Sequence, residues 1–170
     1  IKICKKFKIK VIEDSAEALG TFYKKKHAGT IGDIGILSFN GNKIITTGAG
    51  GAILTNSRSI FKKASDLATL AKKQKKDFEY KFVAYNYRMA SINASLGLSQ
   101  LEDINLRISK RRKLYEKYAK IFSKSSGIKI FKEPKYSKSN YWSQLLILKS
   151  KSKRKNFLEV FRRNKIKSVQ

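Results

Sequence analysis

Residues 34–51 read IGILSFNGNKIITTGAGG, an apolar segment that runs into a loop of glycine, asparagine and threonine. A short apolar run bounded by turn residues is typical of a buried strand, so we expect a strand over 34–39 and a loop over 40–51. Comparable patterns predict further strands at 11–14 and 52–55, and a helix that is capped by Asn56 or Ser57 and runs through about residue 73. This alternation of strands and helices up to residue 90 indicates an α/β fold with a partly parallel sheet.

The rest of the chain is predicted to be mainly helical. Apolar residues repeat at helical spacing from 91 to 122, which predicts one continuous helix. A helix of about 30 residues spans about 45 Å and often connects two domains. Other elements are expected as follows: the end of an amphipathic helix over 1–10, a loop or hairpin over 20–32, a strand over 141–148 and a helix over 156–163.

The composition excludes several classes of site. Cys4 is the only cysteine and His27 the only histidine, which leaves no internal disulfide and no metal site built on several such residues. No apolar run approaches the roughly 20 residues needed to cross a bilayer, and no signal-peptide pattern is present. We therefore expect no membrane partner and a cytoplasmic location.

The net charge of +27 raises the question of a nucleic-acid partner. Two basic stretches, 110–113 and 149–155, could contact phosphates and keep a basic nucleic-acid-binding module open as an alternative. However, the excess is mostly lysine and is scattered along the chain, as a lysine-biased proteome would produce. We expect these charges to be solvated surface, with no nucleic acid bound.

Two features of the α/β region carry candidate chemistry. Glu13 and Asp14 end the first strand, where ligands bind in open α/β sheets, although an acid at a strand end is also a common turn residue. Lys43 lies in the glycine-rich loop among apolar or small neighbours, which favours a partly desolvated amine. Desolvation makes a neutral, nucleophilic amine available for Schiff-base chemistry. A solvated surface charge, a tight turn and an anion-binding nest are the alternatives for this loop.

Two later segments leave a functional and a structural interpretation open. Asn86 precedes the long helix and is either a functional amide or, like Ser91, a helix cap. Asn140, Tyr141 and Trp142 form an aromatic strand start that is compatible with plain core.

These segments resemble the DegT/DnrJ/StrS family of pyridoxal-phosphate-dependent sugar aminotransferases, and the match runs nearly end to end. The amino-acid sequence of residues 39–43, together with that of Ser139 to Trp142, is most similar to the sequences of family members that act on nucleotide-linked 4-keto-6-deoxy amino sugars, of the bacillosamine and legionaminic-acid type. The motifs that carry the resemblance occur in family order: Val11 to Gly20, Gly32 through Lys43 to Gly51, Asn86 to Met89, Asn93-Ala94 and Leu98 to Leu101.

The resemblance implies a role for each of five residues. Lys43 would carry pyridoxal phosphate as a Schiff base and shuttle the proton between substrate and cofactor. Asp14 would keep the pyridine nitrogen protonated, Ser38 would hydrogen-bond the phosphate, and Glu17 would lie near the ring. Asn86 would reach the phosphate of the neighbouring subunit, so a homodimer is expected. Related dehydratases carry histidine in place of the lysine, so Lys43 favours amino transfer.

The resemblance also implies an architecture and a reaction. The chain would be part of a fold-type-I transferase, with residues 1–103 in the large cofactor-binding domain and residues 104–170 forming the connecting helix and the start of the small domain. The complete enzyme would move an amino group, with glutamate as donor, to C4 of a nucleotide-linked keto sugar. The family's upstream segment that cups the cofactor phosphate is not in this sequence. We therefore expect the chain alone to be inactive, and an inactive remnant of the aminotransferase is a further alternative.

Overall fold

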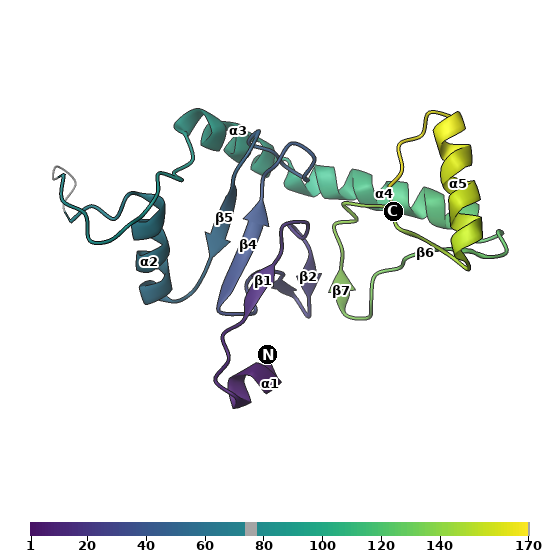
Figure 1. The fold of residues 1–170 in the computed structure, drawn as a ribbon. Helices are drawn as coiled ribbons and strands as arrows, with labels where there is room; N and C mark the ends of the chain where they lie inside the picture. Colours follow the sequence, from purple (N-terminus) through teal and green to yellow (C-terminus); the bar gives the residue numbers. More distant parts are fainter. Residues whose placement is uncertain (74–77, 170) are drawn as a thin grey trace.

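The first part of the molecule is built on a three-stranded sheet (Figure 1). The computed structural model describes residues 1–73 and 78–169. β1 runs parallel to β4, and β5 runs antiparallel to β4 on its other side, so the expected partly parallel sheet is confirmed. The strands lie where their apolar runs predict them: β1 at Ile12–Asp14, β4 at Ile34–Ser38 and β5 at Gly51–Leu54.

The two faces of this sheet differ in exposure, because successive side chains along a strand alternate between them. Leu37 is buried, whereas its neighbour Ile36 is 41% exposed. Ile36 pairs with Ile53 of β5, which is 56% exposed. Asp14 and Ser38 belong to this open face, since Asp14 pairs with Ile36 and Ser38 lies two positions beyond Ile36.

A second sheet joins distant parts of the chain. β2 (Phe22–Tyr23) and β3 (Lys26–His27) form a hairpin, and β7 (Ser137–Lys138) pairs antiparallel with β2. Lys24 and Lys25 turn the hairpin with φ of 47° and 66°, as a two-residue type I′ turn requires. The segment over 20–32 is thus a hairpin. β7 is too short to have been predicted, yet it brings the chain after residue 136 back beside β2.

The continuous helix predicted over 91–122 is wrong in one respect, because the structure contains two helices there. α3 (Ser91–Glu102) and α4 (Ile104–Phe122) meet at Asp103, whose backbone angles (φ −92°, ψ 7°) interrupt the helix. The apolar spacing continues across this break, so the sequence alone suggests one helix. α3 contacts the loop between β4 and β5, and α4 leads away from the first sheet (Figure 1).

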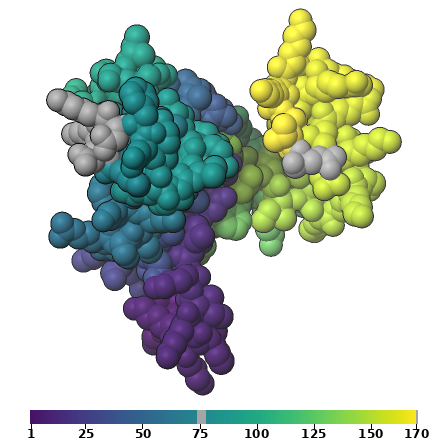
Figure 2. Space-filling view, turned by 60° about the vertical axis from the view of Figure 1, so that its left-hand side comes forward, coloured from purple at the N-terminus to yellow at the C-terminus, as the bar shows by residue number. Residues whose placement is uncertain are grey.

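The C-terminal elements gather around the far end of α4. β6 (Ile128–Ile130) pairs antiparallel with β8 (Leu146–Leu148), and α5 (Lys151–Arg163) contacts β8. In Figure 2 this group, in yellow, stands apart from the rest of the molecule.

Two predictions for these C-terminal elements are wrong at their boundaries. The strand expected over 141–148 keeps only its last three residues, since Tyr141 adopts a left-handed backbone (φ 48°) that an extended strand does not allow. α5 begins at Lys151 rather than at 156, because Ser150 caps it by accepting a hydrogen bond from the Lys153 N–H.

Two further helices precede α3 in the sequence. α2 (Arg58–Ala68) begins at Ser57, whose hydroxyl accepts from the Ile60 N–H, and it ends before the predicted residue 73. α1 (Lys2–Lys6) is shorter than the helix expected over 1–10, since the chain turns at Lys8 with a φ of 55°. No helix within residues 1–73 and 78–169 is long and apolar enough to cross a membrane.

Candidate active site

The carboxyl ends of the parallel strands carry two of the predicted site residues. Asp14 ends β1 and Ser38 ends β4, on the same open face of the sheet. Asp14 Oδ1 accepts a hydrogen bond from the Ala16 N–H at 3.1 Å, so this carboxylate does shape a turn. Its Oδ2 has no hydrogen-bond donor among the described residues and can accept one from a ligand. The Ser38 hydroxyl accepts from the Asn40 N–H at 3.4 Å and keeps its own proton to donate.

Lys43 lies in the loop after β4, and its side chain is only 13% exposed. The amine nitrogen, Nζ, lies 3.4 Å from Glu17 Oε1 and 4.6 Å from the centroid of the Trp142 ring. The partial burial expected of this lysine is therefore present, between a carboxylate and an indole face. The structure thus brings Lys43 to the segment that follows Asp14.

Helix α3 holds the loop that follows β4. The side chain of Gln100 makes two hydrogen bonds to the backbone of Thr46. Its Nε2 donates to the Thr46 carbonyl at 2.7 Å, and its Oε1 accepts from the Thr46 N–H at 3.2 Å. Asn93 Nδ2 donates to the Thr47 carbonyl at 2.6 Å. A Cβ at Gly97 would lie 2.6 Å from Thr47 Cγ2, so glycine is what lets the helix approach this closely. Asn93 and Gln100 belong to the segments that resemble the family, but no pattern in the sequence predicts that they anchor the loop.

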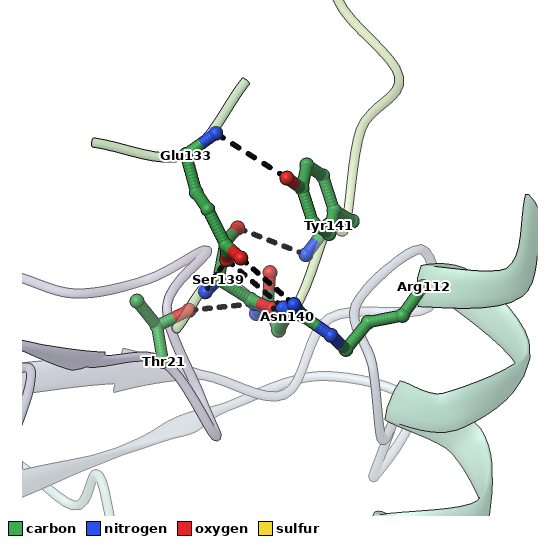
Figure 3. A network of polar contacts seen from close by, with 6 residues as sticks. All are labelled: Thr21, Arg112, Glu133, Ser139, Asn140 and Tyr141. Carbon is green, nitrogen blue, oxygen red and sulfur yellow. Dashed lines mark hydrogen bonds and ion pairs between the residues drawn. The ribbon is translucent and has the colours of Figure 1, made fainter. Parts of the chain in front are cut away.

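Asn140 ties the C-terminal half of the chain to the segment after β1. Its side chain is buried, and Nδ2 donates to the carbonyls of Glu17 (2.8 Å) and Leu19 (3.0 Å). Its backbone N–H donates to Thr21 Oγ1 at 3.1 Å, the contact drawn in Figure 3. Its Oδ1 accepts from the Trp142 N–H at 2.9 Å. Asn140 is therefore a polar clamp, which the interpretation as plain core did not foresee.

Trp142 closes one side of the lysine loop. Its indole nitrogen, Nε1, donates to the carbonyl of Asn42 at 2.7 Å, and its ring faces the amine of Lys43. Trp142 and Asn42 are 100 positions apart in the sequence. No local pattern links residues so distant, so only the folded chain reveals the contact.

A partly buried ion pair between Arg112 of α4 and Glu133 supports the segment that carries Ser139 and Tyr141 (Figure 3). Arg112 donates to both carboxylate oxygens of Glu133, at 2.8 and 2.9 Å, and to the Ser139 carbonyl at 2.6 Å. The hydrogen bond from Arg112 holds the pKa of Glu133 below its usual range, and the same bond raises the pKa of Arg112. Tyr141 stacks on Tyr115 with ring centroids 4.0 Å apart, and burial raises the pKa of Tyr141 to about 12.

The adjacent acids Glu13 and Asp14 have different roles. Glu13 lies on the other face of the sheet and accepts hydrogen bonds from the N–H groups of Gly29, Ile31 and Gly32. Burial by itself would raise the pKa of Glu13, but these three hydrogen bonds outweigh it and hold the pKa below its ordinary value. Glu13 therefore anchors the loop after β3, and Asp14 is the acid that remains available to a ligand.

Asn86 lies between α2 and α3. Its backbone pairs with Thr69, just after α2, and its side chain is exposed. Among the described residues, no hydrogen bond joins the Asn86 side chain to Lys43, Asp14 or Ser38.

Residues 1–169 match the DegT/DnrJ/EryC1/StrS aminotransferase family. The chain belongs to this family. It is 38% identical over 148 residues to EpsN of Bacillus subtilis (strain 168), a match that covers 87% of this chain and 38% of EpsN. It is 35% identical over 154 residues to GDP-perosamine synthase of Escherichia coli O157:H7, covering 91% of this chain and 42% of that protein.

Solved structures of family members have the same fold. PseC of Helicobacter pylori, an aminotransferase involved in the biosynthesis of pseudoaminic acid, matches with a TM-score of 0.87 at 29% identity, over 96% of this chain and 45% of PseC. The PLP form of Spr1654 from Streptococcus pneumoniae matches with a TM-score of 0.84 at 25% identity, over 96% of this chain and 44% of Spr1654. The predicted fold class, part of a fold-type-I transferase, is confirmed. The chain spans less than half the length of these relatives.

Proposed function

We propose that the full-length protein carrying this chain is a pyridoxal-phosphate-dependent aminotransferase acting on a nucleotide-linked 4-keto-6-deoxy sugar. The observation that carries the proposal is the setting of Lys43, a partly buried amine beside a carboxylate at the carboxyl edge of two parallel strands. Membership of an aminotransferase family supports the reaction, and similarity to GDP-perosamine synthase supports the substrate class. The product would serve the synthesis of a surface polysaccharide or glycan precursor.

The side chains at the strand edge fit this cofactor chemically. Lys43 offers an amine, Asp14 offers a carboxylate oxygen, and Ser38 offers a hydroxyl donor. When bound, pyridoxal phosphate would supply an electron-poor ring that stabilises negative charge on the substrate carbon. Asp14 would hold the proton on the pyridine nitrogen, and Ser38 would donate to the phosphate. Lys43 would move a proton at the substrate carbon, with Glu17 orienting its amine.

The proposal also covers a homodimeric assembly, the amino donor and the division of the chain into domains. Asn86 of one subunit would reach the cofactor phosphate of the other in a homodimer, a role supported by the exposure of its side chain. Glutamate would be the amino donor, and the cytoplasm the location. Residues 1–103 would belong to the large domain and 104–170 to the connecting helix and small domain, which the helix break at Asp103 supports.

A basic nucleic-acid-binding module has less support. The run over 110–113 is not a single exposed basic face, because Arg112 turns inward to Glu133 and Ser139. Lys110, Arg111 and Lys113 remain exposed, as does the basic stretch over 149–155, and exposed surface charges of this kind occur in many proteins.

The direct test is to reduce the full-length protein with borohydride in the presence of pyridoxal phosphate and to map the modified peptide. We expect the cofactor on Lys43, and we expect Lys43→Arg to abolish the modification. Lys63→Arg is a matched control, since Lys63 also lies over an aromatic ring, 3.8 Å from the Phe82 centroid, and has no proposed role. Modification mainly at another lysine would contradict the assignment.

A further inference from the structure

We infer that Trp142 is a positioning residue for Lys43: its indole holds the lysine amine and shields it from solvent. The inference rests on the proposed function in one respect, namely that Lys43 is the lysine that takes the cofactor. The contacts themselves belong to the folded chain. They connect the segment between β7 and β8 to the loop after β4.

Two separate contacts join Trp142 to this loop. The indole Nε1 donates to the Asn42 carbonyl at 2.7 Å, which fixes the ring against the backbone immediately before Lys43. The ring face lies 4.6 Å from Lys43 Nζ, within the range of a cation–π interaction. Glu17 lies 3.4 Å from the same nitrogen, so the carboxylate and the indole together set the direction of the amine.

The chain around Trp142 is itself fixed, so the indole is held in place. Its backbone N–H donates to the buried amide oxygen of Asn140. Tyr141 adopts a left-handed backbone (φ 48°), an uncommon state that persists where the surrounding contacts impose it. As a result, Tyr141 stacks on Tyr115 of α4 while the next side chain, Trp142, contacts the lysine loop.

The chemistry of the contact suits a lysine that must be both held and released. An aromatic face attracts a cationic amine through its quadrupole, and the attraction is stronger where water is excluded. The side chain of Lys43 is 13% exposed, so the contact is partly shielded from water. Once the amine becomes neutral, this attraction is lost, and the indole remains as an apolar wall of the site.

The test measures the reactivity of Lys43 in the full-length protein stripped of cofactor. Each lysine is labelled with limiting acetic anhydride, and the Lys43 rate is normalised to that of Lys63 in the same sample by peptide mass spectrometry. Trp142→Leu removes the ring face and the donor, and Trp142→Phe keeps a ring face. Tyr136→Leu is the matched control, since Tyr136 lies 5.0 Å from Lys135 and 5.5 Å from Lys24 and takes no part in the site.

We expect Trp142→Leu to label Lys43 about three- to tenfold faster, the change that corresponds to loss of a cation–π contact of this strength. Trp142→Phe should stay within about twofold of the wild type, and Tyr136→Leu should not change the rate. An unchanged Lys43 rate in a folded Trp142→Leu protein would overturn the inference. So would equal increases in the Phe and Leu variants, because the ring face would then not be the shielding element.

A second measurement covers the case in which Trp142→Leu fails to fold. The emission lost in Trp142→Phe is the Trp142 contribution, and it should fall when pyridoxal phosphate is fixed on Lys43, because the amine that would carry the cofactor lies 4.6 Å from the indole centroid. Undiminished Trp142 emission with the cofactor on Lys43 would overturn the inference. Cofactor fixed on another lysine would instead refute the proposed function, and the labelling rates would still decide the role of Trp142.

Discussion

Replacing Asn140 with alanine should lower the free energy of unfolding by about 3 kcal/mol. The side chain makes three hydrogen bonds: it donates to the carbonyls of Glu17 and Leu19 and accepts from the Trp142 N–H. Each bond contributes about 1 kcal/mol net, and partners left buried without a substitute add to the loss. Asn140 is 3% exposed, so water cannot readily replace the amide. A loss of 3 kcal/mol corresponds to a change of more than 100-fold in the ratio of folded to unfolded protein.

The assay is urea unfolding of the full-length protein, comparing midpoints at an unchanged denaturant slope. Asn156→Ala is the control, because Asn156 is exposed on α5, and its effect should stay within about 0.5 kcal/mol. Thr21→Val, which removes only the acceptor for the Asn140 N–H, should cost about 1 kcal/mol. A loss below about 1 kcal/mol for Asn140→Ala, with the slope unchanged, would refute the view that this residue clamps the two halves of the chain.

Three other predictions follow from the site and from the charge of the chain. Asp14→Asn should fold and bind pyridoxal phosphate but lose at least about 100-fold in turnover, as expected when a group that controls a proton is removed; a near-normal kcat would show that Asp14 has another role. Glu133→Gln should destabilise the protein by about 1.5–3 kcal/mol at neutral pH by breaking a charged hydrogen bond. Because the hydrogen bond from Arg112 holds the folded-state pKa of Glu133 below its unfolded value of about 4.3, this stabilisation is complete above pH 4.3 and is lost as the pH falls through the folded-state pKa. Urea unfolding should therefore show the two proteins converging in acid, and a gap that widens there would contradict the ion pair. Finally, duplex DNA should bind weakly, without sequence preference, and with an affinity that falls steeply between about 50 and 200 mM salt, whereas tight selective binding at physiological salt would favour the nucleic-acid alternative.

Local features of the fold were predictable, and their boundaries were less so. The three strands of the first sheet follow from short apolar runs between turn residues, and Asn56 or Ser57 was the expected cap of α2, of which the structure uses Ser57. The break at Asp103 was not predictable, because apolar residues keep their helical spacing on both sides of it. The start of α5 was missed because the lysine-rich first turns of this helix carry no apolar period.

The sequence by itself determined the three strands of the first sheet, the glycine-rich loop that carries Lys43 and membership of the family, because each depends on residues close together along the chain. Only the tertiary structure decided which of two adjacent acids is available: the alternation of the strand sends Glu13 to three backbone N–H groups and Asp14 to the open face. It also decided that Asn140 bonds to Glu17, 123 positions away, and that Trp142 covers Lys43. Such contacts leave no periodic pattern in the sequence, because their geometry depends on how the strands, α4 and the C-terminal segment pack together.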